Sequence, residues 1–531
     1  MRDLAYLKLL SREYPNIRAA ASDIINLQAI CGLPKGTEYF FSDLHGEHEA
    51  FIYLLRSSSG IIREKIRETF GHIISEEDEV RLANLIYYPE KMINQIKQAN
   101  EYTEDWQKTA VYRLVQICRE VSSKYTRSKV RKKMPKEFSG VIDELLYVDN
   151  TDDNKTEYYS ELINTLIDVR VADSFIVVIC SLIRSLTIDN LHILGDIFDR
   201  GPRPDIILEE LMHFHDVDIQ WGNHDISWMG AATGNRACIC NVLRMALGYN
   251  GFDVLEDGYG INLRPLSMFA ERVYRDDPCT CFLPQILDKN IYDAVDPKLA
   301  AKMHKAIAVL QYKEEGQIIK RHPEYGMEER ILLSAIRYDR GTVTIDGKEY
   351  PMRDMNFPTV DPADPLRLTD EEEELLHTLE LSFRHNARLH EHVRFLYSNG
   401  SMYKCCNSNL LYHGCIPMTE NREFDGLMVG GKMYRGKELM DFIDTQVKNA
   451  YFLPEDAPEK EACRDFMWYL WNGAKSPVFG KDKNRSFEHY FIEDPEVMRE
   501  TMNPYYQLSE EEETCDMILK EFGLPTKGSH I

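Results

Sequence analysis

Short apolar runs alternate with longer stretches of helical periodicity along most of this 531-residue chain. Four of the short runs, at residues 37–42, 191–194, 217–221 and 409–412, have the length and composition of buried strands. Around them, apolar residues recur at about every third or fourth position, which predicts amphipathic helices. Strands that alternate with helices in this way are typical of an α/β protein.

The distances between the strands predict how the chain is organised. Residues 3–31 read as two helices interrupted at Tyr14-Pro15. About 150 residues separate the first two strands, whereas a βαβ unit needs only about 30. The helical stretch 60–170 is therefore interpreted as an insertion. A single short helix at 204–214 predicts that the second and third strands are neighbours joined by a right-handed crossover.

The pattern changes again from about residue 260. Asp346-Gly347 predicts a hairpin turn, and Thr369 with Glu372 forms a capping box that predicts one long helix reaching about Tyr397. These patterns divide the chain into four parts: N-terminal helices at 1–36; a discontinuous core at 37–59, 171–259 and 400–531; a helical insertion at 60–170; and a helical and hairpin insertion at 260–399.

The composition narrows the class of protein. A formal net charge of -24 argues against a general nucleic-acid or anionic-membrane binder, and it means that an anionic substrate would need local cations. The longest apolar run, at 175–180, is too short to span a bilayer. Twelve scattered cysteines without C-x2-C spacing, and an N-terminal segment without an apolar signal core, suit a reducing compartment. We therefore expect a cytoplasmic protein without nucleic-acid or membrane partners.

Polar residues with metal-ligand chemistry follow each predicted strand. The carboxyl ends of strands are where open α/β sheets place their ligands. Carboxylate, amide and imidazole donors together favour Mn, Fe or Zn over a site for Mg alone. The residues concerned are Asp43 and His45 after the first strand, Asp196, Asp199 and Arg200 after the second, Asn223 and His224 after the third, and His413 after the fourth.

The resulting pattern, D-x-H … G-D-x-x-D-R-G … G-N-H-D … H-G, resembles the calcineurin-like metallophosphoesterases. Four longer stretches, at 40–47, 396–403, 411–418 and 476–483, resemble more narrowly the class III fructose-1,6-bisphosphatases of bacteria. The resemblance runs over essentially the whole chain, insertions included. It implies a calcineurin-like β-sandwich core flanked by helices, formed by the discontinuous core parts, with large and mainly helical insertions.

The resemblance also implies a two-metal site, with Mn²⁺ as the expected ion and other divalent ions as alternatives. Asp196 would bridge the two ions and a bridging hydroxide would attack phosphorus. Asp43 and His45 would complete the first metal's protein ligands, and Asn223 and His413 would serve the second.

Three further residues receive catalytic roles by the same resemblance. Arg200 would bind phosphoryl oxygens, and His224 would protonate the leaving alkoxide while Asp199 orients its imidazole. The reaction implied is hydrolysis of fructose 1,6-bisphosphate to fructose 6-phosphate and phosphate, in gluconeogenesis. A phosphoprotein phosphatase, or a catalytically weak metal-binding or regulatory protein, remain alternatives.

Two expectations concern the rest of the substrate and the end of the chain. Two basic loops could hold the second phosphate, with the candidates Lys432, Arg435, Lys481 and Lys483. The other interpretation, at even odds, is that these are ordinary solvent-exposed loop residues.

In the class III enzymes a Ser-His-Ile like 529–531 leads into a Gly-His motif that supplies one more metal ligand. Because the sequence ends there, we expect a fragment of a longer protein that holds its second metal weakly and turns over poorly. A homo-oligomer of this chain is one possible assembly.

Overall fold

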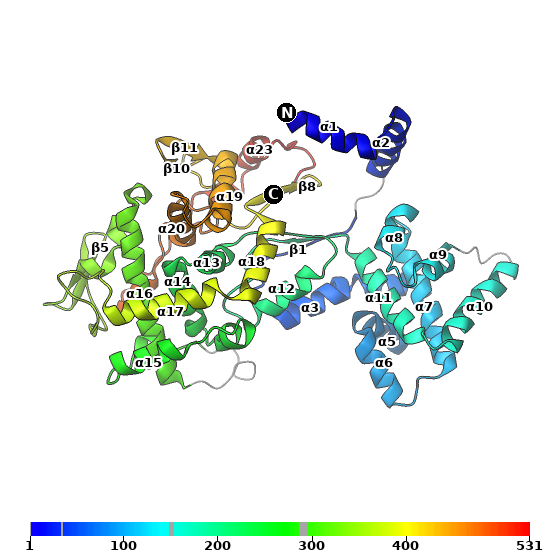
Figure 1. The fold of residues 1–531 in the computed structure, drawn as a ribbon, viewed down its shortest axis with the longest axis horizontal. Helices are drawn as coiled ribbons and strands as arrows, with labels where there is room; N and C mark the ends of the chain where they lie inside the picture. The colour runs from blue at the N-terminus through cyan, green and yellow to red at the C-terminus, as the bar shows by residue number, and fades with distance from the viewer. Residues whose placement is uncertain (1, 33–35, 148–152, 286–295) are drawn as a thin grey trace. The chain divides into compact units, whose positions relative to one another are not determined.

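The structure is a computed structural model, and it describes all residues except 1, 33–35, 148–152 and 286–295. The fold is mixed α/β and mostly helical, with a parallel sheet (Figure 1). The chain divides into two compact units: unit 1 contains Met1–Tyr39 and Ile52–Leu191, and unit 2 contains Phe40–Phe51 and His192–Ile531. The part boundaries expected from the sequence stay a prediction.

Unit 1 is helical, as the periodicity of its sequence predicted. The interruption expected at Tyr14-Pro15 separates the first two helices. Its helices are α1 (Arg2–Glu13), α2 (Ile17–Cys31), α4 (Ile61–Phe70), α5 (Glu76–Tyr87), α6 (Pro89–Gln98), α7 (Glu104–Ser122), α8 (Arg127–Lys133), α9 (Ser139–Tyr147), α10 (Asp153–Asp168) and α11 (Ala172–Thr187). Helix α3 (His48–Ser57) begins in unit 2 and ends in unit 1.

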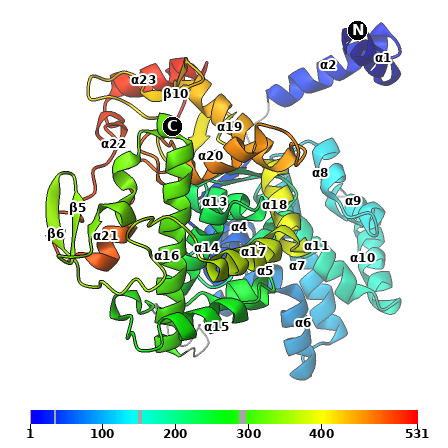
Figure 2. The same ribbon diagram turned by 60° about the vertical axis from the view of Figure 1, so that its left-hand side comes forward.

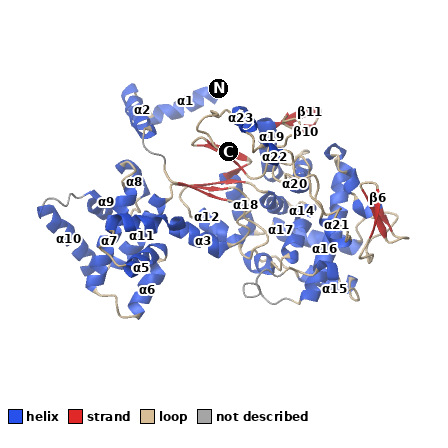
Figure 3. Ribbon diagram, turned by 180° about the vertical axis from the view of Figure 1, so that it is seen from behind, coloured by secondary structure: helices blue, strands red, loops and turns tan. Residues whose placement is uncertain are grey.

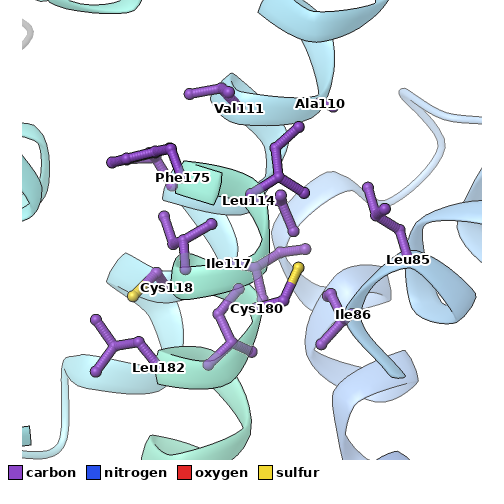
Figure 4. Packing of buried hydrophobic residues seen from close by; sticks show 14 of the residues in the cluster. Leu85, Ile86, Ala110, Val111, Leu114, Ile117, Cys118, Phe175, Cys180 and Leu182 are labelled. Atoms are coloured by element: carbon purple, nitrogen blue, oxygen red, sulfur yellow. The ribbon is translucent and has the colours of Figure 1, made fainter. Parts of the chain in front are cut away.

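The core of unit 1 lies mainly between α7 and α11. Leu114, Ile117 and Cys118 of α7 lie on one face of that helix and are fully buried. Phe175 and Cys180 of α11 belong to the same hydrophobic cluster (Figure 4). Because these apolar side chains recur at helical spacing, each helix buries one continuous stripe. The stripe explains why the insertion was recognisable in the sequence as helical.

The main sheet has the strand order β1-β2-β3-β7. Its strands are β1 (Glu38–Phe41), β2 (Asn190–Ile193), β3 (Val217–Gln220) and β7 (Gly400–Ser401). Strands β2 and β3 are neighbours, as predicted, and β3 pairs with β7 in parallel, whereas the right-handedness of the crossover stays a prediction. The strand that precedes His413 is β9 (Asn409–Tyr412), which pairs antiparallel with β8 (Tyr403–Cys406) in a sheet of two strands.

In unit 2, α18 packs against β3 and β7, and α14 packs beside α16 (Figures 2 and 3). The remaining helices of unit 2 are α12 (Pro204–Met212), α13 (Asn223–Ala232), α14 (Arg236–Gly248), α15 (Arg264–Val273), α16 (Pro297–Arg321), α17 (Asp370–Arg384), α18 (Ala387–Asn399), α19 (Gly436–Phe452), α20 (Lys460–Asn472), α21 (Ser486–Phe491), α22 (Tyr505–Leu508) and α23 (Glu512–Glu521). The remaining strands are β4 (Ile336–Arg337), β5 (Thr342–Ile345), β6 (Lys348–Pro351), β10 (Gly426–Val429) and β11 (Lys432–Arg435).

Two local predictions in this region have different outcomes. The hairpin at Asp346-Gly347 is confirmed by the pairing of β5 with β6. Thr369 and Glu372 form the expected capping box. The prediction of a single long helix is wrong, however. Helix α17 ends at Arg384, and a second helix, α18, begins at Ala387. The Asn386 side chain accepts a hydrogen bond from Leu389 N–H at 2.9 Å, so it caps α18 as a new helix.

Among the described residues, no helix combines the length and apolar character needed to cross a membrane. The twelve cysteines are all free thiols.

Candidate metal centre

Main-chain hydrogen bonds hold the polar ends of β1 and β2 side by side. The N–H of Asp43 donates to Gly195 O at 3.1 Å, and the N–H of His45 donates to Asp196 O at 2.8 Å. In the opposite direction, Gly201 N–H donates to His45 O at 2.8 Å. The D-x-H segment and the G-D-x-x-D-R-G segment therefore form one connected surface, although the sequence separates them widely.

A buried carboxylate, Asp225, ties the end of β2 to the end of β3. Its Oδ2 accepts the N–H groups of Asp196 and Gly222, and its Oδ1 accepts the N–H of Ile197, each at 2.9 Å. Burial and the nearby charge of Asp196 raise the pKa of Asp225 to about 6. Three backbone donors from two loops converge on this one side chain, so it fixes the spacing of the two loops.

The carboxylate of Asp196 lies at the centre of the site. Its Oδ2 is 3.5 Å from His413 Nε2, 3.9 Å from His45 Nε2 and 4.0 Å from His224 Nε2. Asp196 belongs to two groups of possible ligand atoms, one with Asp43 and His413 and one with His45 and His224, and within each group the atoms lie within 4.8 Å of one another. This grouping differs from the predicted one, which joined Asp43 to His45 and kept His224 outside the ligand set. The structure thus brings together four strand ends around one carboxylate.

Asn223 belongs to the turn that wraps around the Asp196 carboxylate. The residue after it, His224, donates its N–H to Asp196 Oδ1 at 3.2 Å. On the other side of Asn223, a side chain at Gly222 would collide with that same oxygen. The position of Asn223 in this turn is compatible with an amide ligand next to Asp196.

Backbone carbonyls orient two of the imidazoles. His45 Nδ1 lies 3.0 Å from Phe198 O, and His413 Nδ1 lies 2.6 Å from Leu194 O. Because a carbonyl only accepts, each Nδ1 carries the proton and each Nε2 keeps a lone pair on the side of Asp196. Burial, with a smaller contribution from His224, lowers the pKa of His45, which favours the neutral ring that binds a metal.

His224 has a different environment from the other two imidazoles. Its Nδ1 lies 2.7 Å from Asp199 Oδ2, and Asp199 Oδ1 accepts the indole N–H of Trp228 at 2.8 Å. Burial alone lowers the pKa of His224. The hydrogen bond that His224 donates to Asp199 and the charges of Asp196 and Asp199 outweigh burial, so the pKa of His224 lies above its ordinary value. This ring is therefore suited to carry a proton rather than to bind a metal.

The backbone is strained where the candidate residues lie. Asp43, His45, Asp196, Asp199 and Arg200 have φ angles of 54°, 42°, 56°, 66° and 67°. Left-handed conformations cost non-glycine residues energy and concentrate at functional sites, where surrounding contacts hold them in place. In this chain the main-chain hydrogen bonds between the loops supply those contacts.

A glycine allows the close approach of the second and third strand ends. Gly195 has a φ of 80°, and a Cβ there would lie 2.5 Å from Gly222 N and 2.7 Å from His413 Nδ1. Any side chain at this position would push the His413 ring away from Asp196. Gly195 is thus required both for its conformation and for space.

The predicted phosphate-binding cations have separate surroundings. Arg200 is exposed, and its charge lowers the pKa of both His45 and His224, so it lies close to the two rings. The other four candidates lie on loops and strands elsewhere: Lys432 pairs with Glu438, Lys481 pairs with Glu500 at 2.7 Å, Lys483 pairs with Asp346 at 2.5 Å, and Arg435 precedes α19. Arg200 therefore lies beside the metal-ligand cluster, and the phosphate-binding role of the other four cations stays a prediction.

The donor set fits divalent metal ions. The described residues place the carboxylates of Asp43 and Asp196 within reach of imidazole nitrogens, with the ligand atoms of each group within 4.8 Å of one another. The two imidazoles with free Nε2 lone pairs next to carboxylate oxygens offer the N and O ligands that Mn, Fe and Zn accept. The structure therefore supports the binding of divalent metal ions.

Sequence reasoning missed two supporting residues. Asp225 stands in the G-N-H-D motif, and its three-residue spacing from Gly222 could have indicated a cap on α13. Trp228 follows His224 by four residues, which places both side chains on the same face of α13. Neither signal reveals the partners, because Asp199 and Ile197 come from another strand end.

Comparisons with known proteins agree with this geometry. The family model described as Firmicute fructose-1,6-bisphosphatase matches residues 5–531. Three proteins named fructose-1,6-bisphosphatase class 3 are similar to the whole of this chain, which covers 80% of each of them: those of Clostridium tetani (51% identical over 529 residues), Clostridium novyi (49% over 530) and Bacteroides fragilis (50% over 530). No solved structure matches the chain. The chain belongs to the Firmicute fructose-1,6-bisphosphatase family.

Proposed function

We propose that this chain hydrolyses fructose 1,6-bisphosphate to fructose 6-phosphate and phosphate, with gluconeogenesis as its expected role. Membership of the family supports the substrate, because relatives of about half identical sequence carry that enzyme name over the full length of this chain. The observation that carries the chemistry is the position of the Asp196 carboxylate, whose Oδ2 lies 3.9 Å from His45 Nε2 and 3.5 Å from His413 Nε2, the imidazoles assigned to the two ions. We infer that the main sheet with its polar strand ends corresponds to a calcineurin-like core.

Asp43, His45 and Asp196 would hold one divalent ion, and Asp196, Asn223 and His413 would hold a second, with Mn²⁺ the expected ion. When bound, two such ions supply Lewis acidity at the phosphoryl oxygens and lower the pKa of an attacking water. The mixture of oxygen and imidazole donors supports Mn²⁺ over Ca²⁺, which prefers oxygen ligands alone.

The chain's own residues account for the rest of the reaction. The Arg200 guanidinium, with its planar fork of donors, would bind two phosphoryl oxygens and stabilise their developing charge. His224, with Nδ1 held by Asp199 at 2.7 Å, would donate the proton on Nε2 to the leaving oxygen of the sugar. The raised pKa of His224 keeps that proton available. Trp228 fixes the other oxygen of Asp199 and so prevents the carboxylate from turning away.

A substrate panel tests the proposal. Fructose 1,6-bisphosphate, fructose 6-phosphate, glucose 6-phosphate and a phosphopeptide are each incubated with the protein in Mn²⁺, Mg²⁺, Ca²⁺ or after exhaustive chelation. We expect phosphate release from fructose 1,6-bisphosphate, faster with Mn²⁺ than with Ca²⁺ and abolished by chelation. Equal turnover of the phosphopeptide would favour a phosphoprotein phosphatase instead. Full activity after chelation would contradict the role of the metal site.

A further inference from the structure

A cavity of unit 2 is lined by residues of α14, α16 and α21 (Figure 2). Its volume is about 330 Å³, which is the size of a small-molecule site. Among the described residues that line it, none is a candidate metal ligand or catalytic residue of the site described above. The exposed residues Leu283, Gln285 and His489 belong to its wall, so the cavity opens to solvent.

Three side chains of the wall form one chain of hydrogen bonds. Burial lowers the pKa of His304 to about 3, so its ring is neutral. The ring donates from Nδ1 to Phe282 O at 2.9 Å, and its Nε2 therefore accepts the hydroxyl of Tyr490 at 3.0 Å. The Tyr490 oxygen in turn accepts a hydrogen bond from Arg244 Nη1 at 3.1 Å. This chain fixes the guanidinium of Arg244 at the wall.

The direct partners of the Arg244 guanidinium are all uncharged. Besides its bond to Tyr490, Nε donates to Gln311 Oε1 at 2.7 Å and Nη2 donates to Asn241 Oδ1 at 2.9 Å. A guanidinium has five N–H groups, so two of them are left after these three bonds. The side chain is 95% buried, yet a guanidinium does not release its proton to relieve burial. Arg244 is therefore a positive charge on the wall without a carboxylate in direct contact, as far as the described residues extend.

A carboxyl group lies one side chain further away. Gln311 Nε2 donates to Glu315 Oε1 at 2.7 Å, so the Gln311 amide separates Arg244 from Glu315. Burial raises the pKa of Glu315, which disfavours its charged form. Glu315 is therefore a weak counter-charge for Arg244.

The other charged residues of the wall already have partners. Arg485 pairs with Asp482 at 2.7 Å, and Glu500 pairs with Lys481 at 2.7 Å. These two pairs cancel in charge, so the excess charge of the wall is the positive charge of Arg244. A buried charge without a counter-ion is costly, and a bound anion would remove that cost.

The wall also offers apolar surface. Met245 and Tyr249 of α14 and its C-terminal end line the cavity together with Leu283. A cavity of this size with apolar walls is larger than a bare inorganic ion requires. Apolar walls with a few polar groups are typical of sites for organic ligands.

We propose that this cavity binds a small organic oxyanion, a carboxylate or phosphate group joined to an apolar body, and that Arg244 binds the oxyanion through its remaining N–H groups. The anion supplies the counter-charge that Arg244 lacks, in charge-assisted hydrogen bonds. Met245 and Tyr249 cover the apolar body. This assignment does not depend on the proposed function of the metal centre.

Calorimetric titration of the metal-loaded protein with benzoate and with phenylphosphonate tests the proposal, and benzyl alcohol is the neutral control. We expect an anion to bind at least tenfold more tightly than the alcohol. Tighter binding of benzoate assigns the site to carboxylates, and tighter binding of phenylphosphonate assigns it to phosphates. Affinities of both anions that do not exceed that of the alcohol would overturn the proposal.

Two arginine variants separate this cavity from the metal centre. Arg244→Gln should weaken anion binding by about 10- to 100-fold, the effect of losing a hydrogen bond between charged groups. Arg200→Gln removes the cation beside the metal-ligand cluster and should leave the affinity unchanged. If R200Q abolishes anion binding, the anion binds at the metal centre and the proposal is wrong.

Surface charges provide a test that keeps the buried network intact. Leu283, at the cavity wall, is 48% exposed, so Leu283→Glu should fold normally and weaken anion binding by about 2- to 10-fold. Leu283→Lys should strengthen binding by a similar factor. Met268 is 63% exposed and does not line the cavity, so Met268→Glu is the matched control with the same change of net charge. An affinity that responds equally to charge at both positions, or at neither, would contradict a site in this cavity.

The position of the ligand can be observed directly. Crystals soaked with 4-bromobenzoate and measured at the bromine absorption edge should show an anomalous peak inside the cavity, next to Met245 and Tyr249. A bromine peak at the metal centre alone, or no peak, would overturn the proposal.

Discussion

Replacing Asp225 by Asn should weaken both the fold and the metal centre. The Asp225 carboxylate accepts three backbone N–H groups, from Asp196, Ile197 and Gly222. An Asn side chain has one acceptor oxygen. At best it keeps the two bonds made by Oδ2 and turns an NH₂ group toward the Ile197 N–H. One buried donor left without an acceptor costs about 1–3 kcal/mol, so D225N should lower the free energy of unfolding by that amount.

The same change should reduce metal affinity, because the bonds it breaks hold the Asp196 loop against the Gly222 turn. Urea denaturation and calorimetric titration of the metal-free protein with Mn²⁺ at pH 8, where the Asp225 carboxyl is ionised, measure the two effects. Asp465→Asn is the matched control: Asp465 is a buried carboxylate paired with Arg321 at 2.9 Å outside the site. D465N should lose stability and keep its metal affinity. Wild-type stability and affinity in D225N would refute this account of how the loops are held.

Two further predictions concern histidines with opposite environments. His224→Ala should leave the metal content unchanged and lower turnover of fructose 1,6-bisphosphate by roughly 10²–10⁴-fold. The variant's turnover of phenyl phosphates with good leaving groups should fall less, because these substrates need less protonation. If steady-state kinetics show an equal loss of turnover for all leaving groups, His224 is a structural residue. His304 bonds Phe282 O at 2.9 Å and Tyr490 Oη at 3.0 Å, and burial lowers its pKa to about 3. Since the unfolded chain takes up a proton below about pH 6.5 and the folded chain does not, stability is lost as the pH falls from 6.5 toward 3. Between pH 6.5 and 5.5 the wild type should lose about 1 kcal/mol more unfolding free energy than His304→Gln, measured by urea denaturation; equal losses would contradict the burial of a neutral imidazole.

The parts of the fold that local sequence determines were predictable. Strands β1, β2 and β3 are short apolar runs that end in polar residues, and each lies where its run predicted. Their carboxyl ends meet because neighbouring strands of a parallel sheet point the same way, so the gathering of Asp43, Asp196 and His224 follows from the pattern.

Features that depend on distant partners were not predictable. Strand β7 has two residues, too few for any periodic pattern, and its pairing with β3 defines it. The break between α17 and α18 depends on the Asn386 cap, whereas the apolar stripe continues on both sides of it. The acidic partners of Lys481 and Lys483 were not predictable either, because Glu500 and Asp346 come from other segments of the chain.

The claim that Asp196 is shared by two metal ions has a direct structural test. Crystals grown with Mn²⁺ would be measured at the manganese absorption edge, and anomalous difference density would locate each ion. We predict two peaks, both within bonding distance of the Asp196 carboxylate, one on the His45 side and one on the His413 side, and the loss of both peaks in Asp196→Asn. Manganese density away from Asp196, or two peaks that persist in D196N, would contradict the account.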